Sequence, residues 1–126
     1  MLKVKTKVLP SKIEGLGLFA DQFIPKGTVI WEYDPAFDER IHKEVLNNVP
    51  EAYKDFFTTY AYREGDEYIL CVDNARFINH SIDANVIDTI KTKTIAARDI
   101  AAGEEITSDY SSFDDDSKSK PSNELY

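Results

Sequence analysis

Three separated segments of this chain carry residue types suited to ligand binding and chemistry. Residues 15–17 form a Gly-Leu-Gly loop, and glycine lets a backbone approach a ligand without an intervening Cβ. Residues 76–81 read Arg-Phe-Ile-Asn-His-Ser and place hydrogen-bonding side chains after an apolar pair. Residues 103–110 end in a tyrosine, whose hydroxyl can orient a nucleophile. Each segment alone is more typical of a turn, a polar corner or a core tyrosine, so only their combination points to a site.

Short strands are expected to position these segments. Residues 2–9 alternate lysine with apolar or β-branched side chains, which predicts a half-buried strand ending at Pro10. Residues 28–33, 68–72 and 86–98 are rich in β-branched and aromatic residues and predict further strands. Because strands do not alternate with helices, a doubly wound sheet is disfavoured. The glycine loop also lacks the third glycine of a dinucleotide-binding fingerprint.

One stretch in the middle of the chain has helical character. Residues 35–47 are compatible with a helix, and Pro50 suits a first helical turn. Spacings of three and four residues then predict one apolar helical face, formed by Tyr53, Phe56, Phe57 and Tyr60. We expect the first three of these aromatic side chains to belong to the core.

Two further patterns concern the edges of the domain. Residues 24–30 and 100–106 share an Ile-x-x-Gly-x-x-Ile pattern, which is either chance or a common hairpin turn. Residues 114–126 are acidic and polar, which predicts a flexible tail. Only Phe113 and the terminal Leu125 and Tyr126 offer it apolar anchors.

Composition limits the class of protein. A chain of 126 residues has the size of one domain. Its net charge of −8 argues against a broad nucleic-acid-binding face and permits a basic partner such as a lysine-rich peptide, although acidity also simply maintains solubility. The single cysteine, Cys71, excludes an internal disulfide and a Cys-only zinc cluster. Without a signal-peptide pattern or an apolar run of ~20 residues, we expect an intracellular, soluble protein.

The three segments in this order, with an Ile-Pro-Lys-Gly turn at 24–27 and a Trp-Glu-Tyr strand at 31–33 between them, resemble the SET domain. That family comprises protein lysine methyltransferases that use S-adenosylmethionine. The resemblance covers about residues 3–113, and the minimal, stand-alone viral and bacterial members are the most similar. It implies a mainly β fold of several small sheets with a knot-like threading of the C-terminal segment. The domain would span residues 1–113, with a short helical insertion at about 36–60.

The resemblance also implies roles for individual residues. Tyr110 would be the catalytic tyrosine, and Arg76 and Asn85 would give structural support. The cofactor would be held by Gly15, Leu16, Gly17, Asn79, His80 and Tyr110. Walls of a substrate lysine channel are expected from Tyr33, Tyr68, Ser108 and Phe113, with Tyr60 and Tyr62 as further candidates. No metal is expected.

The implied reaction is an in-line transfer of a methyl group from a sulfonium to a lysine amine. It requires two reactants aligned about 3 Å apart. It also requires a neutral amine, which burial beside a positive charge favours. The expected partner is a lysine-containing, basic protein, with histone-like proteins among the candidates, and a homodimer is compatible with the fold. No direct contact with nucleic acid or membrane is expected. A histone-like substrate would place the protein at chromatin, a nucleoid or a host nucleus rather than in the cytoplasm.

Three departures from the family pattern keep an alternative open. Residues 81–85 lack the Cys and Pro that often follow Asn-His-Ser, and the tail lacks the cysteines of a zinc module. Ser108 stands where many members have an aromatic residue that influences the number of methyl groups added. The alternative is a catalytically inactive SET-like module that binds the cofactor or a basic peptide. A third hypothesis is an interaction protein that binds no cofactor.

Overall fold

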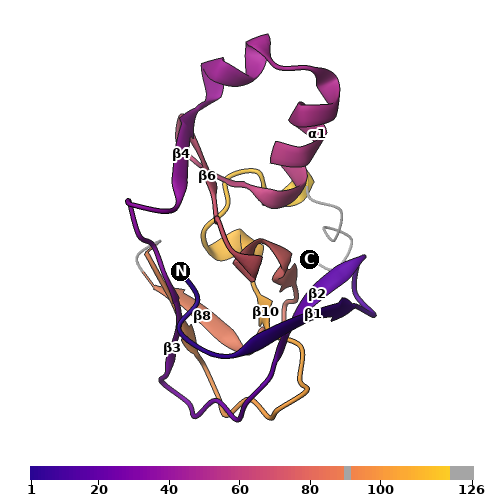
Figure 1. Cartoon of the computed structure of the whole chain (residues 1–126), viewed down its shortest axis with the longest axis vertical. Coiled ribbons are helices and arrows are strands. Elements are labelled where there is room, and N and C mark those ends of the chain that lie inside the picture. The colour runs from indigo at the N-terminus through magenta and orange to yellow at the C-terminus, as the bar shows by residue number, and fades with distance from the viewer. Residues whose placement is uncertain (90–91, 120–126) are drawn as a thin grey trace.

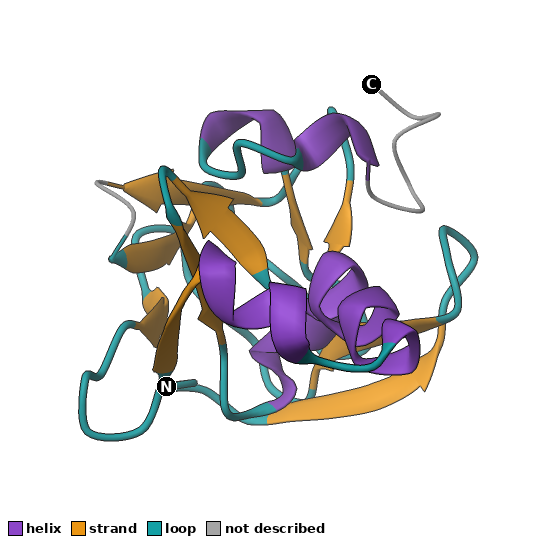
Figure 2. Ribbon diagram, turned by 90° about the horizontal axis from the view of Figure 1, so that it is seen from above, coloured by secondary structure: helices purple, strands orange, loops and turns teal. Residues whose placement is uncertain are grey.

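The computed structural model describes residues 1–89 and 92–119. Within these residues the chain forms several small sheets rather than one large one (Figures 1 and 2). Two are pairs: the antiparallel strands β1 (Thr6–Pro10) and β2 (Leu16–Ala20), and the parallel strands β7 (Asn79–His80) and β10 (Thr107–Ser108). Two are three-stranded: β3 (Val29–Glu32), β9 (Lys93–Ala96) and β8 (Val86–Thr89), and β4 (Glu39–His42), β6 (Glu67–Leu70) and β5 (Tyr62–Glu64).

Helical structure in this part of the chain is short. The α-helix α1 spans Glu51–Tyr60 and lies with β4 and β6 at one end of the molecule (Figure 1). The described 3₁₀ segments are η1 (Lys43–Asn48), η2 (Asn74–Phe77), η3 (Tyr110–Ser112) and η4 (Ser117–Ser119). The predicted fold class, mainly β with several small sheets and a short helical insertion, is confirmed. No helix among the described residues is long and apolar enough to cross a membrane.

The N-terminal segment shows the alternation that its sequence predicts. Leu2, Val4 and Val8 are partly buried against the core, whereas the lysines between them are exposed. The regular strand is shorter than expected, because β1 starts at Thr6 and Leu2 makes only an isolated bridge to Trp31. The apolar side chains of residues 2–8 therefore face the core although the segment is not a continuous hydrogen-bonded strand.

The repeated Ile-x-x-Gly-x-x-Ile pattern builds the centre of the core. Ile24 and Ile100 exchange two backbone hydrogen bonds of 2.8 Å and are both fully buried. Gly27 and Gly103 adopt nearly the same left-handed backbone, with φ of 87° and 88°. This region favours glycine, so the two turns have the same local requirement. The two copies pair with each other, which gives the sequence pattern a structural reason.

The expectation of a helix over residues 35–47 is wrong in its middle. Residues 39–42 form β4, which pairs antiparallel with β6, so tertiary pairing decides the conformation. The buried Asp38 carboxylate accepts hydrogen bonds from the Asp34 and Val72 amides, at 2.9 and 3.1 Å. These bonds tie the start of β4 to the end of β6. The α-helix starts only after Pro50.

The expected core position of the α1 aromatic residues is also wrong. Tyr53 is 61% exposed, and no residue of α1 is fully buried. Phe56 and Phe57 are half-buried, and Phe56 packs against Tyr60 with 5.1 Å between ring centroids. Because α1 lies at one end of the molecule, its apolar face is only partly covered (Figure 1).

The start of the expected flexible tail is packed. Asp114 is 5% exposed, and its Oδ1 accepts hydrogen bonds from the Arg63 and Asp116 amides at 3.0 and 2.9 Å. Asp116 pairs with the Arg63 Nε at 2.7 Å and accepts from the Tyr68 hydroxyl at 3.1 Å. Asp114 and Asp116 therefore hold the C-terminal segment against the β5–β6 hairpin and are not simply exposed to solvent. Residues 120–126, with Leu125 and Tyr126, lie outside the described residues.

Candidate active site

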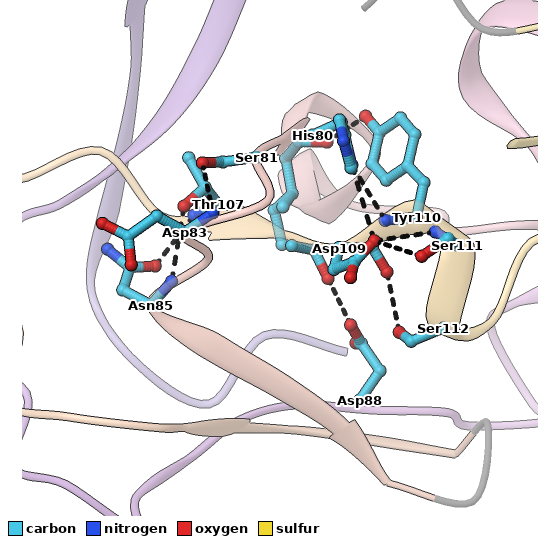
Figure 3. Close-up of polar contacts among 12 residues, drawn as sticks. His80, Ser81, Asp83, Asn85, Asp88, Thr107, Asp109, Tyr110, Ser111 and Ser112 are labelled. Carbon is cyan, nitrogen blue, oxygen red and sulfur yellow. Dashed lines mark hydrogen bonds and ion pairs between the residues drawn. The ribbon is translucent and has the colours of Figure 1, made fainter. Parts of the chain in front are cut away.

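The parallel pair β7–β10 brings the polar cluster and the tyrosine together. Thr107 lies opposite Asn79 and Ser108 opposite His80 in its register. The Tyr110 amide donates to His80 Nδ1 at 3.1 Å, and their ring centroids are 5.3 Å apart (Figure 3). The proximity of Asn79 and His80 to Tyr110, which the family resemblance implies, is therefore present.

His80 is held in a neutral, accepting state. Its side chain is fully buried, and this burial lowers its pKa, while the nearby Asp109 and a backbone hydrogen bond at Ser108 oppose the shift. An unprotonated Nδ1 is needed to accept the Tyr110 amide. The charge state of His80 is thus coupled to the placement of the Tyr110 backbone.

Asn85 supports residues 104–107, at the start of β10, and lines neither of the pockets described below. It is 1% exposed and donates to the Glu104 carboxylate and the Glu105 carbonyl at 2.8 and 2.7 Å. Its Oδ1 accepts the Thr107 amide at 2.9 Å. A buried amide with its partners present holds a backbone segment in register.

The glycine loop is clamped by Asn79 and Glu105. Asn79 Nδ2 donates to the carbonyls of Glu14 and Leu16, both at 3.0 Å, and to Glu105 Oε1 at 3.1 Å. A Cβ added at Gly17 would meet that same Oε1 at 2.1 Å. Gly17 is therefore required by the close approach of Glu105. Gly15, with φ of 45°, makes the turn that exposes this backbone.

Two pockets meet at Tyr110. The first, here the glycine-loop pocket, has about 500 Å³ of space, partly open to solvent, and its wall includes Gly15, Leu16, Phe77 and Asn79. The second, here the aromatic pocket, has about 680 Å³ and its wall includes Trp31, Tyr62, Asp88, Thr94, Ser108 and Phe113. Both share Thr59, Tyr60, Arg76 and Tyr110.

The Tyr110 hydroxyl is oriented by the backbone. It donates its proton to the Ile78 carbonyl in a short hydrogen bond. A phenolic oxygen has one proton and acceptor lone pairs, so once the proton is used, the oxygen acts on other groups as an acceptor. The ring is packed edge-on against Phe113, with centroids 5.9 Å apart. The side chain therefore has a fixed position between the two pockets.

The expected lysine-channel residues divide into two groups. Ser108 and Phe113 line the aromatic pocket, as do Tyr60 and Tyr62. Tyr33 and Tyr68 do not. The Arg40 guanidinium covers the Tyr33 ring, 4.9 Å from its centroid, and the Tyr68 hydroxyl binds Asp116. These contacts hold the two tyrosines on the surface of the β4–β6–β5 sheet.

Sequence reasoning missed Trp31 and Asp88, which also line the aromatic pocket. Val86 and Asp88 share one face of β8, and Val86 is buried in the core. A carboxylate at an inward position of a strand was thus the available signal. Trp31 was missed because the sequence analysis identified its segment only as a strand and did not consider its side chains one by one.

Two donor atoms in the pocket walls are notable. Among the described residues, Trp31 Nε1 and Arg76 Nε are buried without a hydrogen-bond partner. Trp31 lines the aromatic pocket, and Arg76 lines both pockets. Buried donors are normally satisfied, so an unsatisfied one at a pocket wall indicates a place for a ligand or water.

Comparison with known proteins agrees with this geometry. The SET domain family model matches residues 15–111. The chain is 37% identical over 125 residues to a Schizosaccharomyces pombe "Histone-lysine N-methyltransferase, H3 lysine-4 specific", covering 86% of this chain. It is 33% identical over 124 residues to human "Histone-lysine N-methyltransferase 2D", covering 88% of this chain. The chain belongs to the SET domain family.

Solved structures share the fold. A chain of ctPRC2 "bound to S-adenosylmethionine" matches 94% of this chain with a TM-score of 0.67 and 23% identity, over 16% of its own length. A chain of Chaetomium thermophilum polycomb repressive complex 2 matches 85% with a TM-score of 0.65 and 25% identity, over 15% of its own length. The chain also spans only 13% of the S. pombe relative and 2% of the human one.

Proposed function

We propose that this protein transfers a methyl group from S-adenosylmethionine to a lysine side chain of a protein. The observation that carries the proposal is the position of Tyr110 between the two pockets. One pocket would hold each reactant, and Tyr110 would stand where the two meet. Holding two reactants in line supplies several kcal/mol of a displacement barrier, about 7–11 in the best cases.

The glycine-loop pocket fits the cofactor. Gly15 and Leu16 would provide backbone contacts, and Asn79 would keep their loop in place. Arg76 has a buried Nε with no partner among the described residues, so its guanidinium suits the carboxylate of the cofactor's amino-acid part. We therefore extend the expected role of Arg76 from support to binding. The His80 contact with the cofactor stays a prediction. S-adenosylmethionine supplies the methyl group on a positively charged sulfonium.

The aromatic pocket fits a lysine side chain. The rings of Trp31, Tyr62 and Phe113 provide an apolar wall for the four-carbon stem and a π-surface for its cation. When the cofactor is bound, the positive charge of its sulfonium would lower the pKa of the bound ammonium, so that the neutral amine forms before transfer. The Tyr110 oxygen, whose proton is held by the Ile78 carbonyl, would accept an N–H of that amine and orient it.

A basic protein segment is the proposed substrate. The chain carries a net charge of −8, which attracts lysine-rich segments. The relatives' names specify histone lysines, among them H3 lysine-4 and H3 lysine-36. We propose a histone-like substrate on these grounds. The cellular compartment and a homodimer remain predictions.

Calorimetric titration of S-adenosylmethionine tests the cofactor site with a matched pair of variants. Leu16 lines the glycine-loop pocket and is 47% exposed, whereas Leu9 is 44% exposed and lines neither pocket. Leu16→Glu adds bulk and negative charge to the wall and should abolish micromolar binding. Leu9→Glu should leave it unchanged.

Absence of binding to the wild-type protein contradicts the proposal. Binding without methyl transfer to any lysine-rich substrate supports the inactive, cofactor-binding module instead. The surface position of both leucines keeps the comparison free of large folding effects, since exposed substitutions usually change stability by less than about 0.5 kcal/mol.

A further inference from the structure

A carboxylate lies in the wall of the aromatic pocket, close to Tyr110. Asp88, on β8, accepts a hydrogen bond from the Thr94 hydroxyl at 2.6 Å on Oδ1. The Ser108 hydroxyl donates to its Oδ2 in a short hydrogen bond, and the side chain points toward the β10 segment (Figure 3). Thr94 and Ser108 are 5% and 2% exposed, so the carboxylate is held by two buried donors.

This arrangement leaves acceptor capacity on Asp88. A carboxylate offers about four lone-pair sites, and the two hydroxyls use one on each oxygen. Asp114 also lines the pocket, but its Oδ1 accepts two backbone amides and holds the C-terminal segment. Asp88, in contrast, accepts hydrogen bonds from two side-chain hydroxyls, and its remaining lone pairs can accept a donor from a ligand in the pocket.

The electrostatics around Asp88 call for a cation. Burial raises its pKa, with a contribution from Asp109, and the two hydroxyls only partly oppose this. Among the described residues, none of the groups that shift this pKa is a cation. Lys93 also lines the pocket, and its Nζ lies 3.7 Å from the Glu32 carboxylate, on the neighbouring strand β3. Partial burial disfavours the charged form of this half-buried carboxylate, so a cation entering the pocket would be attracted to it.

We propose that Asp88 binds the ε-ammonium group of the substrate lysine, so that the aromatic pocket selects side chains with an N–H to donate. The inference rests on the proposed function and assigns a substrate-binding residue to its lysine site. A serine at position 108 makes the contact possible, because its hydroxyl orients the carboxylate where a ring would fill the space. A trimethylammonium group has no N–H and keeps only its attraction to the charge and the rings.

The side chain of lysine alone is a sufficient probe. Nα-acetyl-lysine methylamide carries the ammonium, and the norleucine analogue has a similar stem without it. Trp31 is the single tryptophan of the chain and lines the pocket, so its indole N–H signal in a ¹H–¹⁵N spectrum reports occupancy directly. The titrations use the full chain with S-adenosylhomocysteine present, which permits binding without reaction.

We expect the wild-type protein to bind the lysine probe about tenfold more tightly than the norleucine probe, as a hydrogen bond to a charged group would give. Asp88→Asn should remove this preference while leaving the norleucine affinity unchanged. Asp83→Asn is the matched control, because it changes the net charge equally at a side chain that is 92% exposed and lines neither pocket. It should keep the preference.

Two results would overturn the inference. One is a wild-type protein that does not distinguish the probes or binds neither. The other is an Asp88→Asn protein that retains the tenfold preference. Transfer of labelled methyl groups by the wild-type protein, measured separately, reports on the proposed function. An active enzyme with an unchanged Asp88→Asn preference would refute only the role of Asp88, whereas ammonium selectivity without transfer would refute the proposed function alone.

Discussion

Replacing Gly17 with alanine should disconnect the glycine loop from its support. The new Cβ would lie 2.1 Å from Glu105 Oε1, the oxygen that also accepts hydrogen bonds from Ser11 Oγ at 2.8 Å and Asn79 Nδ2 at 3.1 Å. The Glu105 side chain is flexible, so it would move rather than the backbone. Its movement breaks both hydrogen bonds to a charged group.

The magnitude follows from these two bonds. Each hydrogen bond to a charged group contributes about 1.5–3 kcal/mol, so we expect Gly17→Ala to lower the free energy of unfolding by about 3 kcal/mol. In a Glu105→Ala background the carboxylate is gone and Ser11 Cβ, at 3.1 Å, remains the close neighbour. Gly17 carries no left-handed φ, so the entropic gain of up to about 1 kcal/mol from alanine should offset this contact and leave a much smaller cost than in the wild type.

Urea denaturation followed by Trp31 fluorescence measures all four proteins of this double-mutant cycle. Gly15→Ala is a useful comparison, because its Cβ would meet nothing within 4 Å and only its φ of 45° is unfavourable. It should cost about 1 kcal/mol. An equal cost of Gly17→Ala with and without Glu105 would refute the steric reasoning.

Three further predictions concern the supports of the site. Because burial lowers the pKa of His80, the unfolded chain takes up a proton first, and the free energy of unfolding should fall as the pH drops below about 6.5. His80→Gln should flatten this slope in urea denaturation, and an unchanged slope would contradict the assignment. Asn85→Ala removes three hydrogen bonds to residues 104–107 and should cost about 3 kcal/mol by the same measurement, whereas no change would show that this segment needs no support from Asn85. Asp116→Asn weakens the ion pair with Arg63 and should raise hydrogen exchange of the Asp115 amide by up to about tenfold, an effect that added salt should reduce.

Local patterns predicted the small strands because each has its own signal. The alternation at residues 2–9 and the β-branched run at 86–98 depend only on neighbouring side chains. The strand β4 has no such signal, because its conformation comes from pairing with β6 far along the chain. The packing of Asp114 was hidden for a similar reason, since an acidic run looks solvated until the Arg63 amide is seen to bind it.

The residues of the site likewise fall into those that local sequence predicted and those that depend on tertiary contacts. The motif residues Gly15, Asn79 and Tyr110 were accessible because their combination is specific to the family. The residues of the pocket walls could not be predicted, because contacts between distant side chains decide which aromatic residues face the pocket. Tyr33 was a reasonable candidate by type, but Arg40 holds it against the sheet. Trp31, two residues earlier, lines the pocket instead.

The most direct test of the central claim is transfer of labelled methyl groups from S-adenosylmethionine to histone proteins and lysine-rich peptides. Tyr110→Phe removes the hydroxyl that lies between the two pockets, and Tyr53→Phe is the control, at a tyrosine that is 61% exposed. We expect transfer by the wild-type and Tyr53→Phe proteins and a loss of at least ~100-fold in Tyr110→Phe, with cofactor binding retained. Equal transfer by all three proteins, or none by the wild type on any lysine substrate, would contradict it.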